Sequence, residues 1–386
     1  MLNFNFYNPT EIIFGKNRLD ELDKHIPQNA KVLITYGGGS VKKYGTLEKV
    51  EKALNGREVF KFGGIEVNPR FSTLLQAVQM IKNNNIDFLL AVGGGSVLDG
   101  TKFIALASKY KGENVEDLLH HGFNAVPTDE ALPMGTVLTL PATGSEMNCG
   151  AVISHKEGKY QVISPLTYPK FSFLDPTLTY TLPKKQVANG VADAFVHTIE
   201  QYLTYPVNAQ FQDRTAEGIL KTLIEISDDA LNKPEDYDTR ANLVWSSTMA
   251  LNGLIGSGVP QDWATHMIGH ELTAAFGIDH ARTLAIVLPS LLRERKEQKR
   301  EKLLQYADRV WNISKGCDEE KMEEAIVKTE EFFLNLDIPV KFSAYGIKTN
   351  EIEQVIHGLK DKNMNTLGET DNLSFDVSRR ILLSAF

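Results

Sequence analysis

A short pattern that occurs twice sets the strongest limit on how this chain folds. Residues 31–41 and 87–97 each consist of an apolar run followed by Gly-Gly-Gly-Ser-Val, and each leads into a helix pattern. Strands that alternate with helices in this way form parallel sheets with right-handed crossovers. We therefore expect an N-terminal α/β domain with a Rossmann-like parallel sheet, whose ligands bind beyond the carboxyl ends of the strands.

The glycine loops at these strand ends are candidate phosphate-binding sites. Glycine lets the backbone approach a phosphate, and the free N–H groups at the start of a helix attract its charge. A tight turn explains one such loop equally well, but two loops at equivalent strand ends favour a pyrophosphate. A third strand pattern, at residues 134–146, adds hydroxyl groups at the same edge, although helix capping is an alternative use for them. The candidate cofactor-binding residues of the three segments are Gly37, Gly38, Gly39, Ser40, Gly93, Gly94, Gly95, Ser96, Thr139, Thr143 and Ser145.

Clustered carboxylate and imidazole groups in residues 189–280 predict a metal site. Asp193 and His197 are four residues apart, as are His266 and His270, and His280 follows. In a helix this spacing places both side chains on one face. Such ligands suit Fe2+ or Zn2+ and leave a coordination position open for a substrate oxygen. The alternative is a set of ordinary helix-face and capping histidines.

Composition and charge exclude several classes of protein. The chain has 386 residues, 42% hydrophobic content and a net charge of -8, which argues against nucleic acid or an anionic membrane as a partner. Its only cysteines are Cys149 and Cys317, so a disulfide framework is excluded and a reducing compartment fits. The absence of an export signal or a long apolar run favours a cytoplasmic protein.

The pattern changes from strands to helices near residue 183, and this predicts two domains. We expect a dinucleotide-binding α/β domain at residues 1–183 and an all-α domain carrying the metal site at residues 184–386. Leu2, Phe4 and Phe6 alternate with polar residues, and a turn at Asn8-Pro9 leads into residues 11–15, which together predict a β-hairpin. The charged run at residues 293–300 indicates a solvated helix face, and the tryptophans are expected in the core: Trp245, Trp263 and Trp311.

With both halves in view, the sequence resembles the iron-containing (group III) alcohol dehydrogenase family over nearly its whole length. The segment from Gly93 to Lys102 looks like the family's pyrophosphate loop, and residues 143–146 look like its second nucleotide-contacting turn. Residues 37–43, 186–190 and 259–263 are similar to the branch of NADPH-dependent butanol dehydrogenases and broad-specificity aldehyde reductases. One departure is Asp279-His280-Ala281, where many relatives have Pro-His-Gly.

The resemblance implies a fold, a site and a reaction. The implied fold is that of dehydroquinate synthase and the iron-containing alcohol dehydrogenases, assembled as a homodimer. Hydride would pass between NADP(H) and a short aldehyde or primary alcohol polarised by Fe2+ or Zn2+. His270 then either relays a proton or orients a metal ligand. The implied metal ligands are Asp193, His197, His266 and His280, and the further implied cofactor residues are Asp99 and Lys159.

The first glycine loop favours NADP(H) over NAD(H). An NAD-selective enzyme commonly has an acidic side chain at this point for the ribose 2′-hydroxyl. Here no acid is available, and Ser40, Lys42 and Lys43 suit a phosphate. Two functions of other classes stay open from the residues alone. A metallohydrolase would use the same Asp and His set to activate water, and a non-catalytic protein would only hold the metal.

Overall fold

The computed structural model describes residues 1–54, 56–156 and 158–386, which form two compact units. The sheet unit comprises Tyr7–Leu182 and Pro234–Val244. The helical unit comprises Met1–Phe6, Pro183–Lys233 and Trp245–Phe386. The main division therefore falls after Leu182. Two short segments belong to the other unit than the residues next to them in sequence: Met1–Phe6 and Pro234–Val244. Each unit is described by itself.

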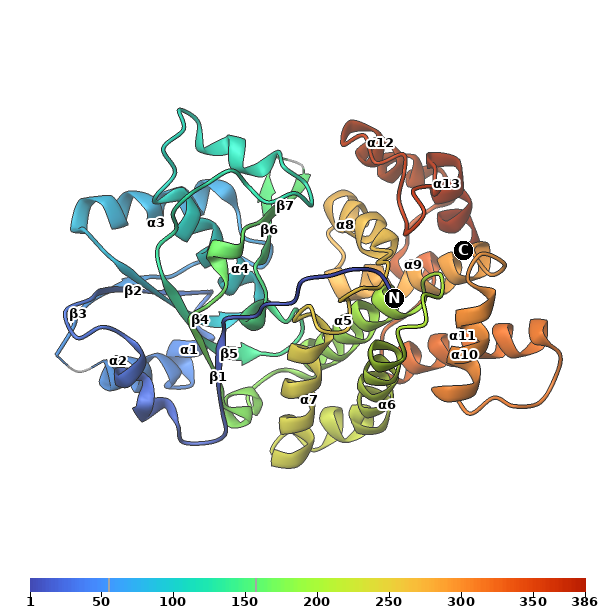
Figure 1. Cartoon of the computed structure of the whole chain (residues 1–386), viewed down its shortest axis with the longest axis horizontal. Helices are drawn as coiled ribbons and strands as arrows, with labels where there is room; N and C mark the ends of the chain where they lie inside the picture. Colours follow the sequence, from blue (N-terminus) through green and yellow to red (C-terminus); the bar gives the residue numbers. More distant parts are fainter. Residues whose placement is uncertain (55, 157) are drawn as a thin grey trace. The chain divides into compact units, whose positions relative to one another are not determined.

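Six parallel strands form the sheet of the first unit, in the order β1-β8-β5-β4-β2-β3. This confirms the predicted parallel sheet and its alternation with helices. Figure 1 labels β1 to β5 of this sheet. The strands are β1 (Glu11–Phe14), β2 (Lys31–Tyr36), β3 (Glu58–Phe62), β4 (Phe88–Gly94), β5 (Met134–Leu140) and β8 (Phe171–Leu174). The helices between them are α1 (Ser40–Lys43), α2 (Thr46–Ala53), α3 (Phe71–Asn84) and α4 (Gly95–Ala107).

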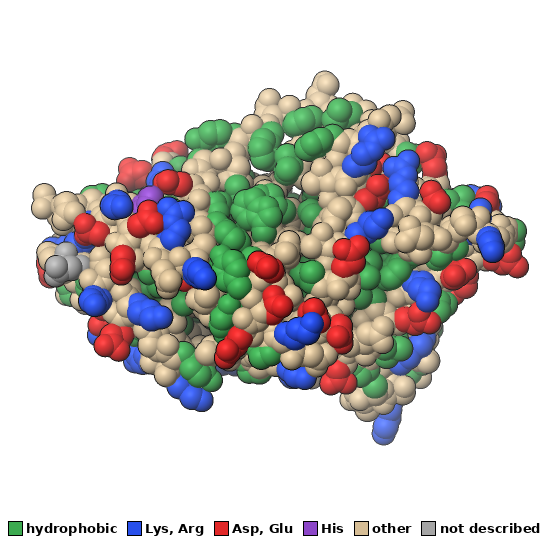
Figure 2. All heavy atoms as spheres, turned by 90° about the horizontal axis from the view of Figure 1, so that it is seen from below, with side chains coloured by type: hydrophobic (Ala, Val, Ile, Leu, Met, Phe, Trp, Pro, Cys, Tyr) green, Lys and Arg blue, Asp and Glu red, His purple; other side chains and the backbone are tan. Residues whose placement is uncertain are grey.

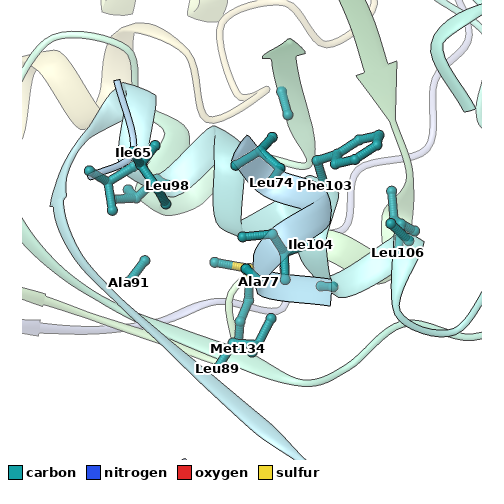
Figure 3. Close-up of a cluster of buried hydrophobic side chains, with 14 of the residues drawn as sticks. Ile65, Leu74, Ala77, Leu89, Ala91, Leu98, Phe103, Ile104, Leu106 and Met134 are labelled. Atoms are coloured by element: carbon teal, nitrogen blue, oxygen red, sulfur yellow. The ribbon is translucent and has the colours of Figure 1, made fainter. Parts of the chain in front are cut away.

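The two faces of the sheet are both buried, because successive residues of the central strands pack on opposite sides. In β4, Leu89 and Ala91 belong to a hydrophobic cluster with side chains of α3 and α4. Leu90 and Val92 belong to a second cluster with side chains of α1 and α2. Figure 3 shows the first cluster, where side chains of α3 and α4 lie against those of β4 and β5. Near-continuous apolar runs such as β4 are thus explained by burial on both faces.

Three glycine- or threonine-rich loops follow three neighbouring strands. β4 pairs in parallel with β2 on one side and with β5 on the other. Since parallel strands end at the same edge, the loops after Tyr36, Gly94 and Leu140 lie at one edge of the sheet. The three predicted nucleotide-binding segments therefore lie at one edge, and binding there stays a prediction.

Two local predictions are wrong. The first fifteen residues do not form a hairpin, because β1 pairs in parallel with β8 and residues 1–10 have no regular secondary structure. The helix predicted after the first glycine loop is broken at Gly45, whose φ of 76° favours glycine. An antiparallel hairpin of β6 (Gly150–His155) and β7 (Gly158–Ile163) was not predicted.

The C-terminal region is helical, as predicted. Pro183 precedes α5, and Gly277, with φ of 67°, ends α8 and lets the chain turn into α9. The helices are α5 (Lys184–Tyr202), α6 (Gln210–Asn232), α7 (Tyr237–Ala250), α8 (Ala264–Phe276), α9 (His280–Glu294), α10 (Arg300–Arg309), α11 (Asp318–Asn335), α12 (Glu353–Asp361) and α13 (Phe375–Ser384).

Some side chains depart from the expected burial. Trp245 is 41% exposed and Trp263 is partly exposed, so neither is a core residue. Lys299, within the run expected to be solvated, is buried and paired with Asp262 at 2.6 Å and Glu369 at 2.8 Å. On the face drawn in Figure 2, basic and acidic side chains are interspersed. Among the described residues, no helix is long and apolar enough to span a membrane.

Candidate metal centre and nucleotide loops

Three helices of the helical unit bring the predicted metal ligands together. Asp193 and His197 lie one turn apart on α5, His266 lies in the first turn of α8, and His280 is the first residue of α9. The spacing of four residues between Asp193 and His197 places both on one helix face. The short Gly277 turn between α8 and α9 then brings His280 back toward His266.

Asp193 is the centre of this group. Its Oδ1 atom lies 3.8 Å from Nε2 of His266, 3.8 Å from Nε2 of His280 and 4.0 Å from Nε2 of His197. Asp193, His266 and His280 each offer an atom within 4.8 Å of the others. Two ligands of one tetrahedral ion, each about 2.1 Å from it, lie about 3.4 Å apart. The spacing is therefore close to that of a metal site.

The chemistry of these atoms fits a cation. Asp193 and His266 are buried, and neither Asp193 Oδ1 nor His266 Nε2 has a hydrogen-bond partner among the described residues. Burial alone would raise the pKa of Asp193, but the surrounding imidazoles lower it below its usual value. The charge of His197 has the largest lowering effect. Burial also opposes charge on His266, but Glu200 and Asp193 raise its pKa to about 9. A divalent cation between these atoms would satisfy both groups.

Glu200, which the sequence reasoning missed, fixes the orientation of His266. Its carboxylate is buried, contacts Nδ1 of His266 through Oε2, and accepts a hydrogen bond from the His266 backbone N–H at 3.2 Å. With Nδ1 engaged in this way, Nε2 points toward Asp193. The available signal was spacing, since Glu200 lies three residues after His197 and hence on the same side of α5.

His270 lies near the four predicted ligands. Its ring centroid is 4.8 Å from that of His280 and 6.2 Å from that of His266. The ring is mostly buried, whereas the side chain of His280 is 24% exposed. The ring of His270 thus lies beside that of His280, which is the most exposed of the four predicted ligands.

Asp279 links two of the ligand-bearing helices. Its Oδ2 atom accepts from Lys185 at 2.7 Å and from the Asn189 side-chain amide at 3.2 Å, and both partners lie on α5. Asp279 directly precedes His280, the first residue of α9. It therefore forms a polar clamp between α5 and the start of α9.

The first glycine loop is open enough for a ligand. Gly39 has φ of 117°, a value that favours glycine, and Gly38 is exposed with nothing within 4 Å of an added Cβ. Ser40 is also exposed. The ammonium group of Lys42 lies 4.9 Å from the centroid of the Tyr36 ring, which keeps it beside the end of β2.

The second and third loops approach each other closely. A Cβ on Gly95 would lie 2.5 Å from Oγ1 of Thr143, so only glycine allows this approach at the start of α4. A Cβ on Gly93 would likewise clash with Val97, at 2.6 Å. The free N–H groups at the start of α4 point toward the same edge, where a phosphate is attracted.

Asp99 and Ser145 face each other instead of lying free at the edge. The Ser145 hydroxyl donates to Oδ1 of Asp99 at 2.6 Å, and the Val152 N–H donates to Oδ2 at 2.9 Å. Burial raises the pKa of Asp99, against the nearby charges of Lys102 and Lys159. Asp99 therefore ties α4 to the third loop and to β6, with Lys159 close by.

Comparison with known proteins identifies the family. The profile described as iron-containing alcohol dehydrogenase matches residues 9–176, and that of the C-terminal region of the same family matches residues 187–370. The chain belongs to the iron-containing alcohol dehydrogenase family. It is an oxidoreductase of the alcohol dehydrogenase class, as the motifs predicted, and a metallohydrolase or a non-catalytic metal-binding protein is not favoured.

Relatives cover the whole chain. It is 56% identical to the NADPH-dependent aldehyde reductase YqhD of Escherichia coli, over 100% of both chains. It is 40% identical to a probable NADH-dependent butanol dehydrogenase of Bacillus subtilis, over 97% of both. A crystal structure of E. coli YqhD superimposes with a TM-score of 0.98 at 55% identity, covering 100% of this chain and 99% of the other. An NADH-dependent butanol dehydrogenase from Thermotoga maritima gives 0.94 at 33% identity, with 100% and 99% covered.

Proposed function

We propose that this chain is a metal-dependent aldehyde reductase that uses NADP(H) to interconvert short, uncharged aldehydes and primary alcohols. The observation that carries the proposal is the set of imidazole nitrogens within 4.0 Å of the buried Asp193 carboxylate. The similarity to an NADPH-dependent aldehyde reductase supports the substrate class and the cofactor. When bound, the metal supplies Lewis acidity toward a carbonyl oxygen, and NADPH supplies hydride.

The residues of the helical unit would hold and orient the metal. Asp193, His197, His266 and His280 are the proposed ligands, and Fe2+ and Zn2+ both suit them. Glu200 would keep Nε2 of His266 directed at the ion. His270 would either pass a proton to the product oxygen or orient His280, since an imidazole titrates near neutral pH.

The loops of the sheet unit would hold the nucleotide. The N–H groups of Gly94, Gly95 and Ser96 at the start of α4 suit a pyrophosphate. The first loop would receive the 2′-phosphate through its backbone N–H groups and through the side chains of Ser40, Lys42 and Lys43. The further proposed cofactor contacts are Gly37, Gly38, Gly39, Gly93, Asp99, Thr139, Thr143, Ser145 and Lys159.

Three further features complete the proposal. Residues 1–183 act mainly in dinucleotide binding, and residues 184–386 act in metal binding and catalysis. A homodimer is proposed from the family resemblance, and a reducing compartment such as the cytoplasm is proposed because the chain has only two cysteines. A single sedimenting species of monomer mass would contradict the dimer.

A substrate panel with reconstituted enzyme tests the function. We expect apoprotein loaded with Fe2+ or Zn2+ to reduce acetaldehyde, propanal and butanal with NADPH, and to reduce carboxylated or phosphorylated aldehydes more slowly. His266→Ala and His280→Ala are expected to lose turnover while keeping NADPH binding. His270→Ala is expected to lose about 10- to 100-fold in activity, as for other residues that act through a ligand. Near-full activity of His266→Ala would show that the metal assignment is wrong.

A further inference from the structure

Trp263 adopts a backbone conformation that bulky side chains rarely adopt. It directly precedes α8 and has φ of 60° and ψ of 3°, in the left-handed region. Asparagine, aspartate and glycine are the usual residues there, and a bulky residue is strained. Strained residues persist only where their surroundings hold them, and they concentrate at functional sites.

The residues before Trp263 are held on both sides. Oδ1 of Asp262 accepts from the Ala264 N–H at 2.9 Å, and the Asp262 N–H donates to the Glu200 carbonyl at 2.9 Å. The second carboxylate oxygen of Asp262 pairs with the buried Lys299 at 2.6 Å. These contacts fix the chain on either side of Trp263, and one of them comes from the residue that orients His266.

The indole N–H is also anchored. Nε1 of Trp263 donates to Oε1 of Gln261 at 2.9 Å, and the Gln261 amide donates to the Gly256 carbonyl at 3.2 Å. A Cβ on Gly256 would lie 2.6 Å from this amide and 2.8 Å from Oε1 of Gln201. The loop from Gly256 to Asp262 is therefore packed so that the indole keeps one position.

In that position the indole contacts two of the proposed metal ligands. Its ring centroid lies 5.5 Å from that of His266, at an interplanar angle of 74°, and 6.2 Å from that of His197, at 63°. The side chain is only partly exposed. The indole thus lies against both imidazoles, and part of its surface remains exposed next to them.

We propose that Trp263 is a specificity-determining residue, an apolar wall against which the alkyl chain of the substrate packs. This inference rests on the proposed function: His197 and His266 would hold the metal that polarises the carbonyl group, and the indole that contacts both imidazoles would then lie within reach of the substrate's carbon chain. An indole offers a large apolar surface and no charge, so it favours uncharged alkyl groups and disfavours carboxylates. Its fixed position also sets a limit on branching next to the carbonyl.

Substitutions of Trp263 distinguish the effect of its side chain from the effect of its strained backbone conformation. Trp263→Gly removes the wall, and glycine adopts positive φ without strain, so the loop is expected to keep its fold. Trp263→Phe keeps an aromatic ring but loses the bond to Gln261. Trp311→Phe is the matched control, because the ring of Trp311 packs against Tyr306 on α10 and not at the metal centre.

Selectivity is the first readout. In Trp263→Gly, kcat/KM for butanal relative to acetaldehyde is expected to fall about tenfold, the size of effect that an apolar contact gives, while the ratio of 2-methylpropanal to butanal rises. Trp311→Phe should leave both ratios unchanged. Unchanged ratios in Trp263→Gly would overturn the inference, whereas a wild type inactive on every aldehyde would overturn the proposed function itself.

Metal-dependent fluorescence is the second readout and requires no turnover. Co2+, which accepts the same ligands as Zn2+, is paramagnetic and quenches an indole close to it. We expect Co2+ added to apoprotein to quench wild-type and Trp311→Phe fluorescence, and to quench Trp263→Phe far less. Equal quenching in the two variants, or none in a wild type that retains Co2+ on dialysis, would show that Trp263 is not at the metal.

Discussion

Glu200 and His266 are joined twice, through the imidazole Nδ1 and through the backbone N–H of the histidine. The carboxylate therefore fixes both the ring and the first turn of α8. A ring whose Nδ1 is held by a carboxylate presents Nε2 as its metal-binding atom, and the carboxylate increases the basicity of that atom.

Removal of this carboxylate should weaken metal binding. Glu200→Ala is expected to lower Zn2+ affinity about 10- to 100-fold, which is the usual effect of losing the partner of a metal-bound histidine. Competition with a chromophoric chelator measures the affinity. Glu200→Gln is the conservative control and should retain more affinity, because its amide oxygen still accepts from the histidine. Unchanged affinity in Glu200→Ala would contradict a positioning role.

The Asp279 clamp should matter for metal retention. Asp279→Ala removes both contacts to α5 and is expected to lower metal affinity about tenfold. Lys185→Met should have a smaller effect, because Lys185 is 60% exposed and exposed ion pairs contribute little. Metal content after dialysis against a chelator compares the two variants. If Lys185→Met loses as much metal as Asp279→Ala, the clamp depends on charge and not on the carboxylate's position.

The first glycine loop should decide between NADPH and NADH. Gly38→Asp fits sterically, since nothing lies within 4 Å of an added Cβ. Its carboxylate would repel a 2′-phosphate and bind a ribose 2′-hydroxyl. We expect kcat/KM for NADPH to fall far more than that for NADH. A wild type that favours NADH, or an unchanged ratio in the variant, would show that this loop does not read the 2′-phosphate.

Lys102 should make the stability of the sheet unit depend on pH. Lys102 is 1% exposed, and its ammonium group donates to the Asn148 side chain and the Gly150 carbonyl, each at 2.8 Å. Burial lowers its pKa to about 8, although Asp99 opposes the change. The pKa in an unfolded chain is about 10.4, so between these values the unfolded chain binds a proton that the folded chain does not. Folded-state stability contributed by this group therefore increases as pH rises through that window.

Urea unfolding of apoprotein at several pH values tests this expectation. The free energy of unfolding of the wild type, relative to Lys102→Met, should increase between pH 8 and pH 10 by up to about 3 kcal/mol. Titration of other groups cancels in the difference. A difference that stays constant across this range would mean that the buried ammonium has an ordinary pKa.

The sequence predicts the central strands of the sheet better than the edge strand β1. Apolar runs such as β4 and the glycine loops after them require strands at the centre of a parallel sheet. The N-terminal hairpin was wrongly predicted because Leu2, Phe4 and Phe6 alternate with polar residues as in a strand, and nothing local reveals that β1 pairs with β8. The β6–β7 hairpin was missed because its burial pattern depends on α4, which packs against it.

The same contrast holds at the candidate metal centre. Asp193 and His197 could be placed on one face of a helix because their spacing is local. Glu200 has the same helical spacing, but its role depends on α8, which is distant in sequence. Trp263 was expected in the core because tryptophan is a large apolar residue. Its strained backbone conformation cannot be predicted from residue types alone. Side chains that act through a neighbouring helix therefore escape sequence reasoning.

The pairing of β1 with β8 has a consequence for synthesis of the chain. β1 cannot enter the sheet until Phe171–Leu174 has left the ribosome, which at about 5–20 residues per second takes on the order of ten seconds. During that interval Ile13 has no place in the core cluster it later joins, and β5 is an open edge. An open edge can pair with other chains. A nascent chain that ends before Phe171 would thus expose the open edge of β5 and be prone to aggregate. Chaperone binding should therefore peak on nascent chains of that length.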